Sequence, residues 1–275
     1  MKVTFIGGGN MAGAMIGGLI RKRWPRKAIR VVEVAQSARG KLERELKVKT
    51  QVALDAGALK CDCIVLAVKP QQVREVAVSL KPLLSSQLVI TIAAGIRVAD
   101  LSRWLGGYRR IVRVMPNTPA LVHAGISGLH APAAVGAGGR AAAERVLSAV
   151  GKTLWLEREE DIDAVTAVSG SGPAYVFYFI EALERAAREL GLGADTAHRL
   201  AVETFSGAVR LLAQSDEPPE TLRGRVTSKG GTTERALQSM EAGHVKEAIV
   251  RAVRAAAGRS RELGDELGKD CPREA

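Results

Sequence analysis

Short apolar runs alternate with amphipathic stretches over the first 159 residues. The short runs are rich in β-branched residues and too short for buried helices, which is typical of buried strands. They are KVTFI (2–6), IRVVEV (29–34), CIVLAV (63–68), LVITIA (88–93) and RIVRVM (110–115). Between them, apolar residues recur at spacings of three and four over 10–23, 37–47, 71–84 and 98–107. The alternation predicts a parallel sheet with helices on both faces.

Helical patterns replace this alternation in the second half. Residues 130–151 begin as a loop and become helical, and TLWL (153–156) predicts one more edge strand. After the acidic run EREED (157–161) the strand pattern ends. Five helices are expected, over 173–190, 195–213, 218–224, 233–242 and 244–267. The fold class is therefore α/β: we expect a domain with a helix-covered parallel sheet over 1–159 and an all-helical domain over 160–275.

Composition favours a folded protein of the cytoplasm. Hydrophobic residues make up 47% of the chain and charged residues 25%. The segment MKVTFIGGGNMAG lacks the long apolar stretch of a secretory signal, and no run approaches the length of a membrane span. We expect no membrane partner.

The net charge of +11 leaves three explanations open: nucleic acid, an anionic small ligand, or solubility. Because the cations spread along the chain and aromatic residues are only 4%, we expect no nucleic-acid partner. Cys61 and Cys63 share one face of a strand, but no nearby histidine or second cysteine pair completes a metal site, so we expect none. The four histidines are scattered, and none stands out as catalytic.

A glycine-rich turn, FIGGGNMAG, links the first expected strand to the first helix. Gly7, Gly9 and Ala12 fit the dinucleotide fingerprint: a tight turn, close approach of the backbone to a pyrophosphate, and close packing of helix on strand. The helix N-terminus then offers N–H groups to the phosphates. This motif predicts an NADH or NADPH site.

Further candidates follow the later strands. Glu33 ends the second strand, where a carboxylate accepts the ribose hydroxyls of NAD and repels the extra phosphate of NADP. Ser37, Arg39 and Lys41 follow closely, so NADPH stays possible. Lys69 and Asn117 lie in LAVKPQQ and VMPNTP, and IAAG (92–95) ends another strand. Since the carboxyl ends of parallel strands meet at one edge, we expect these residues to line one crevice.

Two loops of the helical half carry hydroxyl groups. In SGSGPAYVF, Ser171 and Pro173 suit the start of a long helix. In VTSKGGTT (226–233), glycines and hydroxyls precede another helix, and two interpretations stay open: a capping loop or a site for a small carboxylate.

With these motifs in this order, the chain resembles pyrroline-5-carboxylate reductase, from residue 1 to about 265. The resemblance implies hydride transfer from NAD(P)H to the C=N bond of 1-pyrroline-5-carboxylate, giving L-proline in the last step of proline biosynthesis. It also implies that 1–159 is a Rossmann-type dinucleotide-binding domain and that 160–275 is a helical substrate and dimerisation domain. The homodimer would interlock through the helical domain, with the substrate pocket at the dimer interface, and would commonly belong to a decamer of five dimers.

The resemblance also assigns roles to residues. The cofactor would be bound by Ile6, Gly7, Gly8, Gly9, Asn10, Met11, Ala12, Ala67, Val68, Lys69, Pro70, Ala93, Ala94 and Gly95. The substrate would be bound by Val226, Ser228, Gly230, Gly231, Thr232 and Thr233. Thr233, the catalytic candidate, would lie near the ring nitrogen.

The sequence departs from the family pattern in two places. Glu33-Val34 stands where many members carry an Asn-Arg or similar phosphate-binding pair, and Arg225 stands where Asn or Gln often precedes the substrate loop. The first departure puts an NADPH preference in doubt.

The absence of a strong acid from VTSKGGTT fits an imine substrate. A cyclic imine can arrive protonated, so hydride addition needs orientation more than a proton donor.

Two other classes of protein share some of these features. A 3-hydroxyacid dehydrogenase would want a lysine on the first long helix after the domain boundary, and 173–190 contains none. The other is a non-catalytic dinucleotide-sensing protein or a basic scaffold for nucleic acid.

Overall fold

A computed structural model describes residues 1–269. The chain divides into two compact units: Met1–Ser171 together with the chain from Ala256 onward, and Gly172–Ala255. The first unit therefore extends beyond the expected boundary at residue 159 and includes the end of the last helix.

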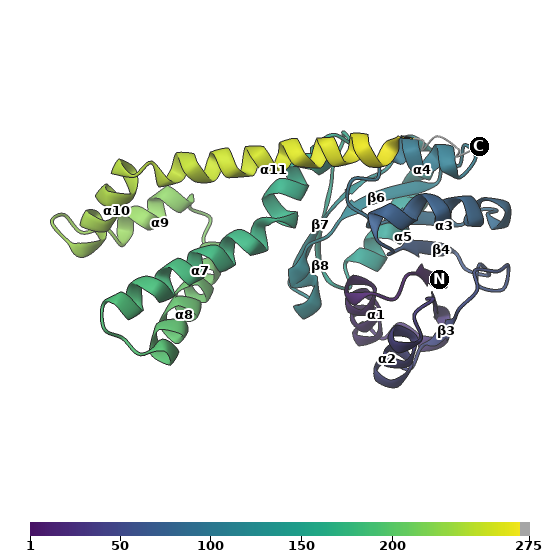
Figure 1. Ribbon diagram of the computed structural model, residues 1–275, viewed down its shortest axis with the longest axis horizontal. Coiled ribbons are helices and arrows are strands. Elements are labelled where there is room, and N and C mark those ends of the chain that lie inside the picture. The colour runs from purple at the N-terminus through teal and green to yellow at the C-terminus, as the bar shows by residue number, and fades with distance from the viewer. Residues whose placement is uncertain (270–275) are drawn as a thin grey trace. The chain divides into compact units, whose positions relative to one another are not determined.

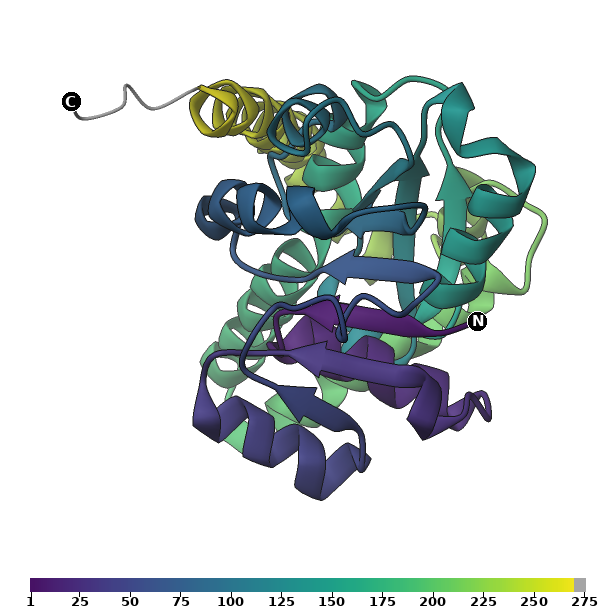
Figure 2. The ribbon, with the colours of Figure 1, turned by 90° about the vertical axis from the view of Figure 1, so that its right-hand side faces the viewer.

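The first unit is built on an eight-stranded sheet (Figures 1 and 2). Its strands are β1 (Val3–Ile6), β2 (Ile29–Val32), β3 (Lys49–Gln51), β4 (Cys63–Leu66), β5 (Leu88–Thr91), β6 (Ile111–Met115), β7 (Gly125–His130) and β8 (Gly151–Trp155). Their order is β3-β2-β1-β4-β5-β6-β7-β8. All neighbouring strands are parallel except β6 and β7.

Helices cover both faces of this sheet. They are α1 (Asn10–Arg21), α2 (Gln36–Leu46), α3 (Val73–Leu80), α4 (Val98–Trp104), α5 (Gly136–Leu147) and α6 (Asp161–Val165). Residues of α1, α2 and α5 share one apolar core with alternate strand residues, and those of α3 and α4 share a second core with the others. This three-layer arrangement confirms the predicted Rossmann-type fold, and the period-2 alternation of buried strands explains it.

Two strands, β3 and β7, were not expected from the sequence, and β7 pairs antiparallel with β6 in an otherwise parallel sheet. β3 is a short polar edge strand, and it lacks the apolar run from which the other strands were predicted. β7 contains Gly125 and Gly128, which lower strand propensity. A Cβ on Gly128 would lie 2.9 Å from Val165 Cγ1, so a larger residue there would push α6 away from the sheet.

The second unit is entirely helical. Its helices are α7 (Gly172–Glu189), α8 (Ala194–Ala213), α9 (Pro219–Arg225), α10 (Thr232–Ala242) and the first part of α11 (Val245–Gly268). These bounds lie within about two residues of the segments expected from the sequence, which is the usual uncertainty at helix ends. All-helical character beyond the sheet is confirmed.

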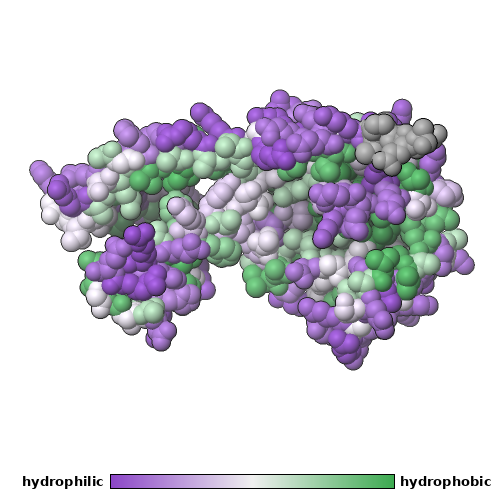
Figure 3. All heavy atoms as spheres, viewed as in Figure 1, coloured by the Kyte–Doolittle hydropathy of each residue, from purple (hydrophilic) through white to green (hydrophobic). Residues whose placement is uncertain are grey.

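This helical unit buries little of its own apolar surface. Its described residues include only Ala197 and Ala201 as buried hydrophobic side chains, while Phe177, Tyr178 and Leu190 are more than half exposed. Figure 3 shows apolar side chains among the polar ones on its surface. Exposed apolar surface of this extent marks a protein interface.

No helix within residues 1–269 is long and apolar enough to cross a membrane. The same residues contain no cluster of three or more histidine, cysteine, aspartate or glutamate side chains placed to hold a metal ion. Cys63 is buried on β4, and burial raises the pKa of its thiol, as expected for a packing residue.

Candidate active site

A cavity of about 640 Å³ lies at the carboxyl ends of β1, β2 and β4. The strand order reverses between β1 and β4, and ligands bind at such reversal points in open α/β sheets. Among the predicted cofactor residues, those that line this crevice are Ile6, Gly7, Gly9, Glu33, Ala67, Val68 and Lys69.

The glycine-rich turn is shaped for close approach of a ligand. Gly7 has a φ of +100°, and a Cβ there would lie 2.6 Å from the Ala67 carbonyl oxygen. A Cβ on Gly9 would instead meet no protein atom within 4 Å. The backbone conformation and packing at Gly7 therefore require glycine for folding. The absence of a side chain at Gly9 instead leaves a space that a phosphate group can enter.

The start of α1 supplies the electrostatics of a phosphate site. No acidic residue lies in its first turn, and no side chain caps it at Gly9. Its first N–H groups and the positive end of the helix dipole are therefore available to an anion. Gly8, Gly9 and Asn10 also line a smaller cavity of about 240 Å³ beside Lys41. These features fit the pyrophosphate of a dinucleotide.

Met11 and Ala12 lie on the inner side of α1. Ala12 is buried and Met11 packs against the same core, so both hold α1 against the sheet. This is the role that the fingerprint gives its third small residue.

Glu33 joins the glycine-rich turn to the loop after β2. Its two carboxylate oxygens accept the N–H groups of Gly8 and Ala35, each at 2.7 Å. Arg39 donates to the carbonyl oxygens of Glu33 and Val34, so its guanidinium braces the same loop. Each carboxylate oxygen keeps a further lone pair for a ribose hydroxyl. Binding of the cofactor by Glu33 stays a prediction.

We expect Glu33→Ala to move the ratio of kcat/KM for NADPH over NADH about tenfold toward NADPH, because it removes a negative charge from the edge where the extra phosphate would lie. Steady-state kinetics with both cofactors measures the ratio. Glu33→Gln is the matched control for shape, since it removes the charge and keeps one acceptor oxygen. An unchanged ratio in both variants contradicts this role for Glu33.

The cofactor residues predicted at the ends of β4 and β5 lie in different surroundings. Lys69 is exposed at the end of β4, next to Pro70, with no ion pair within residues 1–269. Ala93 is buried, and a Cβ on Gly95 would lie 2.9 Å from Leu267 Cδ1 near the end of α11. The turn over 93–95 therefore packs against α11, and cofactor contacts by Ala93, Ala94 and Gly95 stay predictions.

Asn117 has its side chain committed to the protein itself. Its Oδ1 accepts the Ile126 N–H at 3.0 Å, and its Nδ2 donates to Ser169 Oγ at 3.2 Å. Ser169 lies in a π-helical turn, Thr166–Gly170, of the kind that often marks functional sites. Asn117 thus links the segment VMPNTP to the segment SGSGPAYVF through its hydrogen bond to Ser169. Its contact with the cofactor stays a prediction.

The loop of predicted substrate residues lies between α9 and α10 in the helical unit. Gly231 precedes α10 without any side-chain capping bond, so the hydroxyls are not used as caps. Gly230 has a φ of +74°, and its N–H donates to Glu234 Oε2 at 2.7 Å. The Gly230 N–H is therefore already bonded to Glu234 and is not available to a substrate carboxylate.

The Gly231 N–H is used within the loop, where it donates to the Ser228 carbonyl at 3.0 Å, but three hydroxyl groups are free. Within residues 1–269, the hydroxyls of Ser228, Thr232 and Thr233 have no hydrogen-bond partner, and Val226 is exposed. The first N–H groups of α10 have no acceptor within the helix. Three hydroxyls and a helix N-terminus together suit a small carboxylate with an adjacent polar atom.

Sequence reasoning missed part of the crevice lining. Val52 and Leu54 follow the unpredicted β3, and Gln72, Glu75 and Val76 face the crevice from the start of α3 and the turn before it. The helical spacing of 72, 75, 76 and 79 was the available signal, because it puts these positions on one face.

Fold and site together define a dinucleotide-dependent oxidoreductase with a Rossmann-type unit and an appended helical unit. The sequence model for pyrroline-5-carboxylate reductase dimerisation matches residues 159–263. The model described as NADP oxidoreductase, coenzyme F420-dependent, matches residues 2–95.

Whole-chain relatives narrow the assignment. The pyrroline-5-carboxylate reductase of Pseudomonas aeruginosa is 44% identical over 98% of both chains, and that of Haemophilus influenzae is 40% identical over 95% of this chain and 97% of the relative. The solved structure of the Coxiella burnetii enzyme has a TM-score of 0.90 at 41% identity, covering 95% of this chain and 98% of that one. The Plasmodium falciparum enzyme, solved with NADP bound, has a TM-score of 0.85 at 30% identity, covering 96% and 98%. The chain belongs to the pyrroline-5-carboxylate reductase family and is an NAD(P)-dependent oxidoreductase.

Proposed function

We propose that this protein reduces the C=N bond of 1-pyrroline-5-carboxylate with NADH or NADPH and so forms L-proline, the last step of proline biosynthesis. Full-length similarity to enzymes of this name supports the activity. The observation that carries the site is the loop Val226–Thr233, where free hydroxyls surround a helix N-terminus and no strong acid is present.

The chemistry explains why that combination suffices. Hydride adds to the carbon of a protonated C=N bond, the π electrons become a lone pair on nitrogen, and the positive charge is lost. No alkoxide forms, so no acid has to neutralise one. What the protein must supply is orientation of the ring.

The roles divide between the two units of the chain. The Rossmann-type unit holds the dinucleotide, which supplies the hydride when bound. In the helical unit, Ser228 and the N–H groups of the loop bind the substrate carboxylate, and the Thr233 hydroxyl holds the ring nitrogen. Val226, Gly230, Gly231 and Thr232 shape the same loop.

Assembly and location complete the proposal. The match to a dimerisation family and the exposed apolar side chains of the helical unit support a homodimer interlocked through that unit, which completes the substrate pocket. We further propose that five such dimers form a decamer and that the protein is located in the cytoplasm. Light scattering coupled to size exclusion distinguishes dimer from decamer.

The activity is tested by mixing purified protein with pyrroline-5-carboxylate and NADH or NADPH. We expect loss of absorbance at the nicotinamide band and formation of proline. Loss with neither cofactor contradicts the proposal and favours a dinucleotide-binding protein without catalysis.

Thr233→Ala is expected to lower kcat about tenfold and leave the Kd of the cofactor unchanged, because one hydrogen bond to the reacting ring is lost. Thr227→Ala is the matched control, since the Thr227 hydroxyl donates to the Arg223 carbonyl at 2.7 Å and serves the loop alone. Steady-state kinetics and cofactor titration measure both. Equal loss of turnover and cofactor affinity in Thr233→Ala would mark its role as structural.

A further inference from the structure

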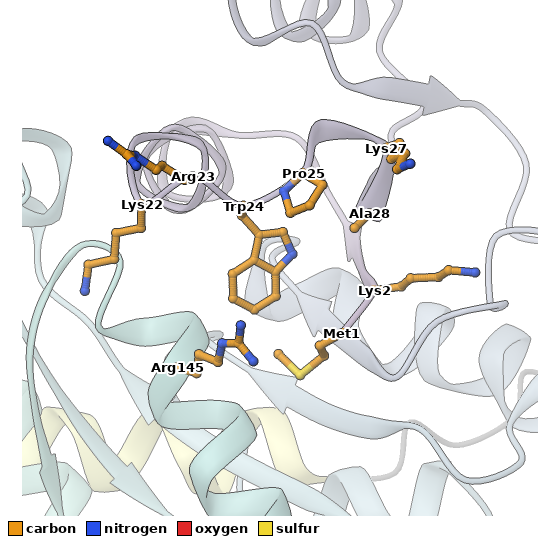
Figure 4. A pocket seen from close by; sticks show the side chains of 9 residues that line it. All are labelled: Met1, Lys2, Lys22, Arg23, Trp24, Pro25, Lys27, Ala28 and Arg145. Atoms are coloured by element: carbon orange, nitrogen blue, oxygen red, sulfur yellow. The ribbon is translucent and has the colours of Figure 1, made fainter.

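A second cavity, of about 690 Å³, lies at the opposite edge of the sheet (Figure 4). It is lined by Lys2 just before β1, Lys22 to Pro25 after α1, Lys27 just before β2, and Arg145 on α5. We call it the basic pocket. It adjoins the amino ends of β1 and β2, whereas the cofactor crevice adjoins their carboxyl ends, so the two sites are separate.

The cations of the basic pocket lack anionic partners. Lys2, Lys22, Arg23, Lys27 and Arg145 line it, and no acidic residue does. In the part of the chain that the structure describes, none of the five forms an ion pair, and Lys22 contacts only Ser148 Oγ, at 3.4 Å. Cations gathered around one cavity repel each other and attract an anion into it.

Arg23 occupies a position that favours glycine. Its φ is +63°, and the N–H groups of Arg23 and Trp24 donate to Ile20 and Leu19 in the turn that ends α1. A left-handed residue at this point of a helix end is usually glycine, because a side chain there costs conformational free energy. The chain nevertheless places a guanidinium here, beside the basic pocket.

Trp24 adds an unused donor. It is only 9% exposed, and its indole nitrogen has no hydrogen-bond partner within the described residues. Figure 4 shows this nitrogen on the side of the ring that faces Ala28 and Lys2, while Arg145 lies against the ring, 4.7 Å from its centroid. The indole nitrogen is thus a buried donor at the wall of the basic pocket, available to an acceptor that enters it.

We propose that the basic pocket binds an oligophosphate, an anion with two or three linked phosphate groups. One carboxylate or one phosphate leaves most of the five cations unpaired, whereas linked phosphates present several charges within a volume of this size. Arginine binds phosphate oxygens in a bidentate manner, and lysines neutralise the remainder. Because Arg145 already covers one face of the Trp24 ring, recognition rests on the phosphates rather than on a stacked base.

The test is isothermal titration calorimetry of the full chain, saturated with NADPH so that the cofactor crevice is filled. Sodium triphosphate is the first titrant and ATP the second. We expect both to bind, with affinity at least tenfold weaker in the double variant Arg145→Gln/Lys27→Gln. Arg140→Gln is the matched control, since Arg140 lies on the same helix and stacks on Trp155 at 4.5 Å, and it should change the affinity less than twofold.

The outcomes separate the sources of the phosphates. Similar affinities for triphosphate and ATP support recognition of the phosphates alone, and tighter binding of ATP supports a nucleotide as their source. Equal loss of affinity in the double variant and in Arg140→Gln overturns the proposal, as does the absence of binding. A single-stranded oligonucleotide that binds more tightly than triphosphate through the same residues overturns it in favour of nucleic acid.

A fluorescence measurement provides an independent readout if the double variant folds poorly. Triphosphate should change tryptophan emission in the unmodified chain and in Trp155→Phe, and the change should vanish in Trp24→Phe. A signal that persists in Trp24→Phe contradicts binding at this pocket.

Discussion

Replacing Gly9 with alanine is expected to raise the Kd of the dinucleotide about 100-fold while leaving the free energy of unfolding unchanged. A Cβ on Gly9 meets no protein atom within 4 Å, so the fold accommodates it. The same Cβ enters the space through which a pyrophosphate reaches the first N–H groups of α1. Loss of two hydrogen bonds to a charged group costs about 3 kcal/mol, which corresponds to about 100-fold in affinity. Cofactor titration and urea unfolding measure the two quantities.

Two neighbouring glycines make this prediction specific. Gly7→Ala should raise the Kd of the dinucleotide and also lower the free energy of unfolding by about 3 kcal/mol, because alanine is strained at a φ of +100° and its Cβ overlaps the Ala67 carbonyl. Gly17→Ala should neither raise the Kd nor lower the free energy of unfolding, because its Cβ makes only an ordinary contact at 3.8 Å with Leu46 Cδ2. Unchanged cofactor affinity in Gly9→Ala would place the dinucleotide elsewhere.

Sequence patterns predicted the elements whose physics is local. The amphipathic helices and the apolar strands of the Rossmann-type unit follow from periodicity alone, because each buries one face or both. The glycine fingerprint predicted the crevice because a tight turn and a close approach both require glycine. Gly7 has the positive φ that a tight turn requires and Gly9 borders open space, while close approach of a cofactor at Gly9 stays a prediction.

Features that depend on distant partners were not predictable in the same way. The strand β7 was not predicted because glycines lower strand propensity, and Gly128 serves packing against Val165 of α6, on another element. The committed amide of Asn117 depends on Ser169, 52 residues away. For VTSKGGTT, spacing left a capping loop and an anion site equally open, and only the geometry at Gly231 shows that no hydroxyl serves as the cap.

The end of α11 was likewise assigned to the helical domain, since its periodicity is helical whichever unit it packs on. In the structure Ser260 Oγ donates to Asp163 Oδ1 at 2.6 Å, within the first unit. Arg97 pairs with Asp265 at 2.7 Å at the same end of the helix. The chain therefore leaves the Rossmann-type unit near Ser171 and returns to it near Ala256, so the helical unit is tethered at both ends.

Among the substitutions considered, the largest loss of unfolding free energy is expected in the buried charge cluster of Arg113, Glu159 and Asp163. Arg113, on β6, has a side chain only 5% exposed, with Nη1 donating to Glu159 Oε1 at 2.9 Å and Nη2 lying 4.0 Å from Asp163 Oδ1. Glu159 also accepts the Val98 N–H at the start of α4, at 2.7 Å. One guanidinium on β6 thus contacts both Glu159, which binds the start of α4, and Asp163, which binds Ser260 of α11.

Arg113→Met is expected to lower the free energy of unfolding by about 3–5 kcal/mol, because it leaves two carboxylates in a largely buried site without their cation. Urea unfolding at a fixed protein concentration measures it, since dimerisation couples stability to concentration. Arg97→Met is the control: its pair with Asp265 is exposed on both sides, so the loss should stay within about 1 kcal/mol. Adding Glu159→Gln and Asp163→Asn to Arg113→Met should restore part of the stability, because the uncompensated charges are then removed. A loss in Arg113→Met no larger than that in Arg97→Met would show that the buried cluster does not hold this region together.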